Sequence, residues 1–263
     1  MCGRWCTGKR KEASKLRSVN ELEGYTLRAT DGDIGKASDI YFDDQDWTVR
    51  YLVADTGGWL TGRLVLISPQ SLGAADMAGE DLQVSLTRDQ IESSPPITSD
   101  HPVSRQYEAE FHDYYGYPYY WGQPYLGAAA SGALVSTPAQ SPPPAVPEGT
   151  APTEAVEEQE RRGDPHLRSA GEVTGYHIEA ANGEIGHVED FLVDDESWRI
   201  ELMVIDTRDW LPGKKVVVAL RDISAIHWPD RVVRVAQTRE EIESGPEFDQ
   251  SSLRDHRQGP PLI

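Results

Sequence analysis

The residues best suited to chemistry in this sequence are acidic side chains in two glycine-containing segments. The first is DGDIGKASDIYFDD, residues 31–44, and the second is NGEIGHVEDFLVDD, residues 182–195. An EF-hand calcium loop needs oxygen ligands at its first, third and fifth positions, then a glycine, with flanking helices. Counted from Asp31, Gly35 takes the fifth position and Lys36 the sixth, so the pattern fails. A Walker phosphate loop also fails, because it requires two glycines five residues apart, then Lys and a hydroxyl residue before a helix, whereas Gly32 and Gly35 are three apart and Lys36 precedes an alanine. The segments therefore favour turns and water-exposed strand ends over a metal or phosphate site.

Other acidic residues come in pairs or at strand ends. Asp43-Asp44 and Asp194-Asp195 resemble the paired general acid and base of a hydrolase. Adjacent residues on a strand point to opposite faces, and each pair precedes a tryptophan in a turn, so a hairpin turn is the better interpretation. Asp55 and Asp206 each precede a threonine at the end of the most hydrophobic strand, where we expect Asx-type hydrogen bonds.

The remaining reactive side chains form no recognisable site in the sequence. The seven histidines do not fall at metal-ligand spacing with one another, and no serine-centred nucleophile elbow occurs. Cys2 and Cys6 are followed by no second Cys or His pair at zinc-finger distance, so we expect incidental thiols in a terminal arm. The prediction is a protein with no catalytic residue, no cofactor and no bound metal.

An internal repeat sets the organisation of the chain. At an offset of 151 residues, Gly24–Pro95 aligns without a gap with Gly175–Pro246, and roughly a third of the aligned positions are identical. The period is too long for a stacked solenoid. The sequence therefore predicts a duplicated domain.

Each repeat has the alternating apolar pattern of short strands joined by tight turns. Asn182-Gly183, a strong hairpin dipeptide, stands where the first repeat has Asp31-Gly32. The glycines expected to shape these turns are Gly32, Gly35, Gly183 and Gly186. Because a small sheet exposes two edges unless it closes, we predict a small β-barrel in each repeat. An open sheet covered by the other repeat is the alternative.

A short helix is predicted at the end of each repeat. Thr87 and Gln90, and likewise Thr238 and Glu241, have the spacing of a capping box. Each helix should end before the proline that follows it. The predicted fold class is therefore mainly β, with two small barrels, each with a short C-terminal helix, joined by a long linker rich in Pro, Ala and Glu.

The predicted boundaries follow the changes in composition. They are a disordered basic arm at 1–20, the first repeat at 21–97, a Tyr-rich segment at 98–136, a disordered linker at 137–168, the second repeat at 169–248 and a disordered tail at 249–263. The linker has too few large apolar side chains to offset the cost of ordering. The Tyr-rich segment is expected to dock on a barrel or a partner through its aromatic rings, with aggregation-prone disorder as the alternative.

Charge and hydropathy limit the classes of partner. The formal net charge is -19, from 44 acidic and 25 basic residues, which argues against nucleic-acid and anionic-membrane surfaces. No apolar run is long enough for a transmembrane helix, and no signal-peptide pattern follows the basic arm. We expect a cytoplasmic protein without an integral membrane segment.

Two tryptophans are the candidate recognition residues. Trp59 and Trp210 follow a turn and precede Leu60 and Leu211, where a core strand would not place them. They either plug a barrel end or form exposed anchors for a partner, because tryptophan is a frequent hot-spot residue.

The repeat pattern resembles a known family. It reads G-Y-x-L/I-x-A-x-(D/N)-G-(D/E)-I-G-x-x-x-D, then DD-x-x-W, a strand ending V-x-D-T, and W-L-x-G. This is similar to the PRC-barrel family, which includes the cytoplasmic domain of the photosynthetic reaction-centre H subunit and the C-terminal domain of a ribosome-maturation factor. The resemblance implies a small β-barrel in each repeat, used for docking rather than catalysis and often self-associating.

The predicted function is a non-enzymatic docking or assembly module for a photosynthetic or stress-related complex. Its expected partners are other proteins, or the two barrels with each other, and peripheral association with a membrane complex is compatible with this prediction. The alternative is a small-ligand or metal-binding protein, or a hydrolase, that uses the acidic strand ends.

Overall fold

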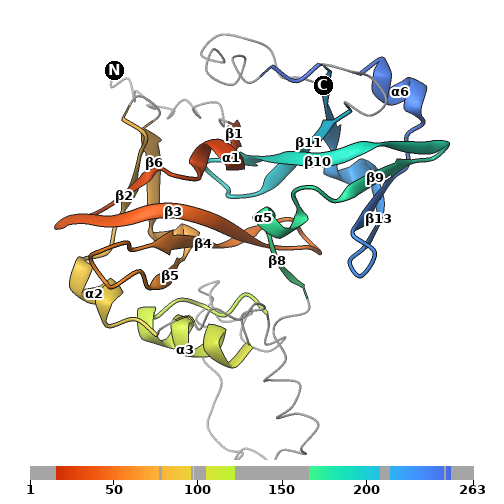
Figure 1. The fold of residues 1–263 in the computed structure, drawn as a ribbon. Helices are drawn as coiled ribbons and strands as arrows, with labels where there is room; N and C mark the ends of the chain where they lie inside the picture. Colours follow the sequence, from red (N-terminus) through yellow and green to blue (C-terminus); the bar gives the residue numbers. More distant parts are fainter. Residues whose placement is uncertain are drawn as a thin grey trace, which may run out of the picture. The chain divides into compact units, whose positions relative to one another are not determined.

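The computed structural model describes residues 16–76, 79–95, 97, 105–121, 166–207, 214–245 and 247–249. The chain divides into two compact units, of which the first comprises residues 1–97 and 166–263 and the second residues 98–165. Both repeats belong to the first unit, and Figure 1 shows their strands and short helices.

The first half of the chain alternates short strands with single helical turns. Its elements are β1 Leu16–Ser18, α1 Val19–Leu22, β2 Thr26–Ala29, β3 Gly32–Asp43, β4 Val49–Asp55, β5 Leu64–Ile67, the 3-10 turn η1 Pro69–Ser71, β6 Leu72–Asp76, β7 Asp81–Val84 and α2 Arg88–Glu92. Helix α3, Arg105–Tyr115, belongs to the second unit.

The second half follows the same order of elements. These are β8 Leu167–Ser169, α5 Ala170–Val173, β9 His177–Ala180, β10 Gly183–Asp194, β11 Ile200–Asp206, β12 Lys215–Ala219, η2 Leu220–Asp222, β13 Ile223–His227, β14 Val232–Val235 and α6 Arg239–Glu243. The internal repeat in the sequence is therefore also a repeat of structure.

Each repeat forms a sheet of seven strands. The first follows the order β5-β4-β3-β2-β7-β6, and the second follows β12-β11-β10-β9-β14-β13. Neighbouring strands are antiparallel, except for the parallel pairs β2–β7 and β9–β14. The seventh strand of each sheet comes from the other repeat: β8 pairs with β3, and β1 pairs with β10. The mainly β prediction is confirmed.

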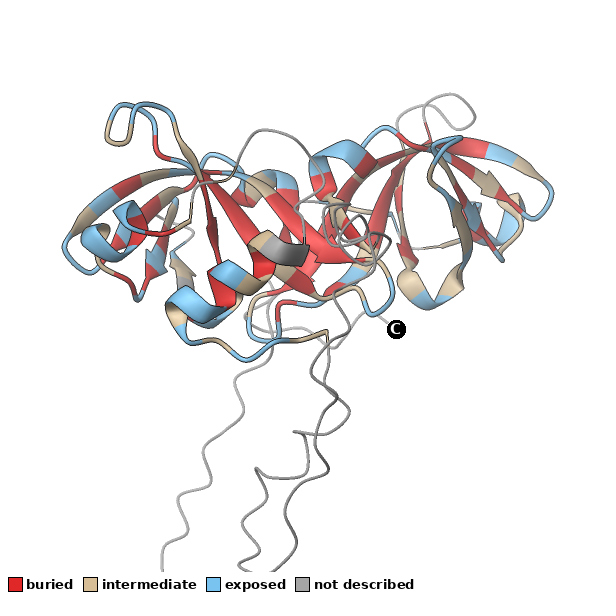
Figure 2. Ribbon diagram, turned by 90° about the horizontal axis from the view of Figure 1, so that it is seen from below, coloured by how far each residue is buried: buried red, intermediate tan, exposed pale blue. Residues whose placement is uncertain are grey.

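The sheets do not close into barrels, which corrects the predicted closed fold. In the described residues, each sheet has two edge strands, which are β5 and β6 in the first sheet and β12 and β13 in the second. Buried apolar residues line the strands of both sheets, coloured red in Figure 2. The long strands β3 and β10 also bury side chains where the two repeats meet, among them Phe42 and Phe191. At β12, the short segment at Glu247 and Phe248 covers part of the edge, because the Phe248 amide donates to the carbonyl of Lys215 at 2.8 Å.

Two predicted boundaries move because of the exchanged strands. Strand β1 lies inside the segment predicted as a disordered arm, and the first two residues of β8 lie inside the segment predicted as a disordered linker. Both strands contain the sequence Leu-Arg-Ser and lead directly into a helical turn, whose N-cap is Ser18 or Ser169. The ordered part of each repeat therefore begins earlier than the composition indicated.

The predicted capping boxes are both present. The Thr87 hydroxyl accepts from the Gln90 amide at the start of α2, while the Gln90 side chain accepts from the Thr87 amide. Thr238 and Glu241 make the same reciprocal contacts at the start of α6. Each box satisfies amides that the first turn of a helix leaves unpaired.

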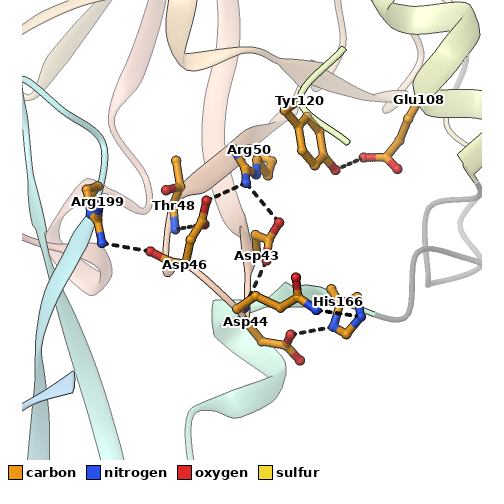
Figure 3. A network of polar contacts seen from close by, with 10 residues as sticks. Asp43, Asp44, Asp46, Thr48, Arg50, Glu108, Tyr120, His166 and Arg199 are labelled. Carbon is orange, nitrogen blue, oxygen red and sulfur yellow. Dashed lines mark hydrogen bonds and ion pairs between the residues drawn. The ribbon is translucent and has the colours of Figure 1, made fainter. Parts of the chain in front are cut away.

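The second unit carries the Tyr-rich segment, in which α3 was not predicted. The ring of Tyr115 stacks on that of Tyr117 at 5.4 Å, and the Tyr117 amide donates to the carbonyl of His112. The Tyr120 hydroxyl donates to Glu108, as drawn in Figure 3. The chain thus turns back after α3 and packs its aromatic rings on the helix.

Candidate functional site

The loop between β4 and β5, residues 56–63, presents the predicted recognition residues of the first repeat. Trp59 and Leu60 are half-buried, while Gly57, Gly58 and Thr61 are exposed. Internal hydrogen bonds close the loop, including the amides of Trp59 and Gly62, which donate to the carbonyls of residues 56 and 57 at 3.2 and 2.5 Å. The loop therefore holds an aromatic ring in a defined place without burying it in the core.

Two arginines fix this loop against helix α2. Arg63 donates to the carbonyl oxygens of Glu92, at 3.0 Å, and of Ser94, which are acceptors at the end of that helix. The guanidinium of Arg88 lies over the Trp59 ring, 4.5 Å from its centroid. Cation–π attraction of this kind restrains the ring.

Two of the predicted recognition residues belong to the counterpart loop of the second repeat. Trp210 and Leu211 lie outside the described residues. The residues that flank the loop do repeat: Thr207 donates its hydroxyl to the carbonyl of Lys214 at 2.6 Å, as Thr56 does to Arg63 at 2.7 Å.

The four predicted glycines all adopt positive φ, but for two different reasons. Gly32 and Gly183, at 147° and 143°, directly follow the hairpin turns. Gly35 and Gly186 lie within β3 and β10, beside register shifts that turn an isoleucine inward. A Cβ at Gly35 would lie 2.0 Å from the carbonyl oxygen of Asp55. These two glycines therefore permit a close strand contact rather than a turn.

The first acidic pair, Asp43-Asp44, is part of a polar network, shown in Figure 3. Asp43 and Asp46 both accept from Arg50 Nη2, at 2.9 and 2.8 Å. The Asp43 carboxylate also accepts from the Gln45 amide, and the Trp47 amide donates to the Asp43 carbonyl, so Asp43 closes a hairpin turn as predicted. This arrangement gives the pair a structural role.

Other acids in these segments do not face water, which corrects the expectation of exposed strand ends. Asp190 and Asp194 are each 5 % exposed. Asp55 does accept the predicted Asx-type bond, from the Gly57 amide at 2.8 Å. Asp206 is buried in β11, in the other sheet from Asp55.

The exchanged strands bring together residues of both repeats. Ser169 donates its hydroxyl to Asp39 at 2.6 Å, and Ser18 donates to Asp190, the equivalent aspartate. The amide of Asn20 reaches the second oxygen of Asp190 at 3.0 Å. The amide of Gly171 reaches Asp39 in the same way, at 3.1 Å. Each aspartate of the motif I-G-x-x-x-D thus receives the N-cap serine and the next turn of the other repeat.

Ion pairs extend this reciprocal pattern. Arg17 pairs with Asp195 at 2.8 Å, and Arg168 pairs with Asp44 at 3.1 Å. His166, just before β8, places its Nδ1 atom 2.9 Å from the other carboxylate oxygen of Asp44. The second aspartate of each acidic pair therefore binds the strand donated by the other repeat.

Aromatic rings pack at the centre of this junction. Phe42 stacks on Trp47 at 5.3 Å and lies 5.6 Å from Phe191 of the second repeat, and Trp47 lies 6.4 Å from Phe191. The backbone crosses the same boundary twice: the Val49 amide donates to the Trp198 carbonyl, and the Ile200 amide to the Trp47 carbonyl, both at 2.8 Å. The junction is therefore a continuous part of the core.

Burial changes the acid–base properties of the junction. Burial raises the pKa of Asp190, although hydrogen bonds from Ser18 and two backbone amides act against it. Burial also raises the pKa of Glu23, and the negative charges of Asp39 and Asp190 raise it further. Three carboxylates from the two repeats therefore interact at this place.

We expect the stability of the protein to depend on pH through Asp190. Because its pKa is raised in the folded state, the contribution of Asp190 to stability is full below its ordinary value of 3.8 and is lost as the pH rises through the raised pKa. As the pH rises through this range, the unfolding free energy of the wild type should fall relative to that of Asp190→Asn. The fall should be about 1.4 kcal/mol for each unit by which folding raises the pKa of Asp190. Urea unfolding from just below pH 3.8 upward measures this difference.

Asp33→Asn controls for the loss of one negative charge, because Asp33 is exposed on β3. Identical pH profiles for the two variants would show that the burial of Asp190 does not cause the effect.

The sequence carried a signal for this junction that the predictions missed. At the same offset of 151 residues, Leu16-Arg17-Ser18 is identical to Leu167-Arg168-Ser169. The predicted repeats begin at residues 21 and 169, so they leave out the first Leu-Arg-Ser and all but the serine of the second. The motif aspartates Asp39 and Asp190 were noted as a pattern but assigned no partner.

Two findings concern metals and membranes. Within the described ranges, no group of three or more His, Cys, Asp or Glu side chains is arranged to hold a metal ion. In the same part of the chain, no helix is long and apolar enough to cross a membrane.

The geometry defines a mainly β protein in which each of two similar sheets is completed by a strand of the other repeat. Residues 15–91 match the family model of the PRC-barrel domain, so this part of the chain is a PRC-barrel domain. The predicted family is thereby confirmed for the first repeat. The match begins before β1, so the donated strand belongs to the domain. No sequence among the curated proteins matches the chain.

Proposed function

We propose that this chain is a non-catalytic docking protein that binds a protein partner through the loop of residues 56–63. The observation that carries the proposal is the state of Trp59, which is half-buried and held under the guanidinium of Arg88 at 4.5 Å. A ring held in place before binding loses little conformational freedom when a partner covers it. Tryptophan in such a position is a typical interface hot spot.

The surroundings of the ring support the same function. Leu60 adds a second half-buried apolar side chain, and the exposed Gly57 and Gly58 allow another backbone to approach closely. Arg63 ties the loop to the end of α2, so that the loop and helix form one surface. This combination of an apolar centre and a rim of backbone and charge is the usual organisation of a protein interface.

We further propose that the partner belongs to a photosynthetic or stress-related complex at a membrane. The PRC-barrel match of residues 15–91 supports this class, because the family includes the cytoplasmic domain of the reaction-centre H subunit. With a net charge of -19, attraction to anionic lipid is unfavourable, so binding would depend on a protein of that membrane.

Trp59→Ala is expected to weaken partner binding by tenfold or more, because loss of a hot-spot tryptophan costs about 2 kcal/mol or more. Tagged full-length chain is incubated with membranes of the source cell, and the bound fraction is measured by sedimentation over a range of concentrations. Thr61→Gly is the matched control, since Thr61 is exposed in the same loop at a φ of 57° that suits glycine.

Two outcomes would contradict the proposal. Equal membrane binding by Trp59→Ala and the wild type, with unchanged thermal stability, would exclude the loop as the docking surface. Undiminished binding to protein-free vesicles of anionic lipid would exclude a protein partner as the cause.

A further inference from the structure

Two histidines of the second repeat lie side by side on its sheet. His177 is the first residue of β9, and His187 is its direct partner across the antiparallel pair β9–β10. The centroids of their rings are 4.6 Å apart. A whole hairpin turn separates the two residues along the chain, and this is not a metal-ligand spacing that the sequence would reveal. The register of the sheet is what brings the two rings together.

Both rings belong to the outer face of this sheet. His177 is exposed, whereas the next residue, Ile178, is fully buried. Because neighbouring residues of a strand point to opposite faces, the side chain of His177 points away from the core. Residues paired directly across two antiparallel strands share a face, which places the half-buried His187 on the same side. A hydrated ion can therefore approach the pair from solvent.

A carboxylate orients the first of the two rings. The Nδ1 atom of His177 lies 3.1 Å from Oε1 of Glu184, which is exposed on β10. An ionised carboxylate only accepts hydrogen bonds, so Nδ1 donates, and the neutral ring then has its lone pair on Nε2. Histidines that bind metals are held in this way, by a carboxylate on the ring nitrogen that does not bind the metal. Glu184 therefore prepares Nε2 of His177 to act as a ligand.

We propose that His177 and His187 together bind a divalent metal ion such as Zn²⁺, Ni²⁺ or Cu²⁺, with water in its remaining coordination positions. A metal–imidazole bond is about 2.0–2.1 Å long, so one ion can join two ring nitrogens that lie up to about 4.2 Å apart. Rings whose centroids are 4.6 Å apart are close enough to place two nitrogens within that separation. Imidazole suits these three ions, and Cu²⁺ should bind the most tightly of them. The net charge of -19 also favours the approach of a cation.

The first repeat lacks this pair and offers an internal reference for it. At the equivalent paired positions it has Thr26 and Lys36, and Asp33 stands where the second repeat has Glu184. Two protein ligands are fewer than a structural or catalytic zinc site uses, so the ion should exchange with the solution rather than stay permanently bound. Because the two histidines are adjacent only in the folded chain, bound metal should stabilise the fold. This inference is independent of the proposed docking loop, which belongs to the first repeat.

Isothermal titration calorimetry with Zn²⁺ tests the site in the untagged chain, which carries Cys2→Ser and Cys6→Ser to remove competing thiols. We expect His177→Gln, His187→Gln and Glu184→Gln each to weaken Zn²⁺ binding by about tenfold or more, Glu184→Gln because it removes the group that orients His177. The matched control is His227→Gln, which should leave the affinity unchanged. His227 is also exposed on this sheet, but β14 separates its strand from β9.

A second variant moves the pair to the first repeat. Thr26→His combined with Lys36→His should add one Zn²⁺ ion per chain, because these two residues have the same register as His177 and His187. Urea unfolding without metal shows that each variant is folded. The proposal is wrong if His177→Gln and His187→Gln both bind Zn²⁺ as tightly as the parent chain, or if the parent chain binds none of the three ions at millimolar concentration. Failure of the transferred pair to bind an ion would also contradict it.

Discussion

Gly186→Ala is expected to destabilise the protein by about 3 kcal/mol or more, one of the two largest effects that the structure predicts. An added Cβ would lie 1.9 Å from the carbonyl oxygen of Asp206, and the backbone there has a φ of 141°. Neither atom is at the end of a flexible side chain, so β10 and β11 would have to separate. Urea unfolding followed by circular dichroism measures the loss. Gly35→Ala should behave alike in the first repeat.

Gly58→Ala is the matched control for both glycine variants. Gly58 has no heavy atom within 4 Å of an added Cβ, so the substitution should change the unfolding free energy by less than about 0.5 kcal/mol. A loss at Gly186 no larger than at Gly58 would show that the strands accommodate a side chain at this position.

Phe191→Ala is expected to cost about 3–5 kcal/mol and to loosen the junction between the repeats. Phe191 is fully buried and packs on Phe42 and Trp47 of the first repeat. The cavity therefore opens beneath the exchanged strands. Urea unfolding gives the loss of stability. Loosening of the junction is measured as faster hydrogen exchange of the β1 and β8 backbone amides than in the wild type.

Leu82→Ala separates a loss at the junction from a general loss of stability. Leu82 is equally buried but lies in β7, two strands from β3 in the sheet. Leu82→Ala should lower the unfolding free energy. At equal stability, it should accelerate the hydrogen exchange of the β1 and β8 amides less than Phe191→Ala does. If both variants accelerate those amides equally, the aromatic cluster has no special part in holding the repeats together.

The loop that carries Trp59 and the exchanged strands lie in different parts of the first unit. Trp59 lies in the loop between β4 and β5, whereas the exchanged strands meet the opposite end of β3. Asp55, next to the loop, pairs with Lys36 near the start of β3, while Asp43 at its end pairs with β8. A partner bound at the loop would therefore leave the junction between the repeats intact.

Local sequence alone determined the hairpins, the capping boxes and the repeat. A capping box joins residues three positions apart, so it can be recognised without the fold. Thr87 and Thr238 were identified in this way and begin the predicted helices. Gly35 and Gly186 were predicted in turns but lie in bulges, because the neighbouring strand leaves no room for a Cβ there.

Only the tertiary structure decided which repeat each Leu-Arg-Ser strand completes and whether the sheets close. A strand that folds back on its own repeat and one that crosses to the other can use the same backbone hydrogen bonds, so local sequence does not distinguish them. The choice depends on contacts between distant residues, such as Phe42 with Phe191 and Ser18 with Asp190. Burial of Asp190 follows from the same choice, because the strand that covers it comes from the other end of the chain.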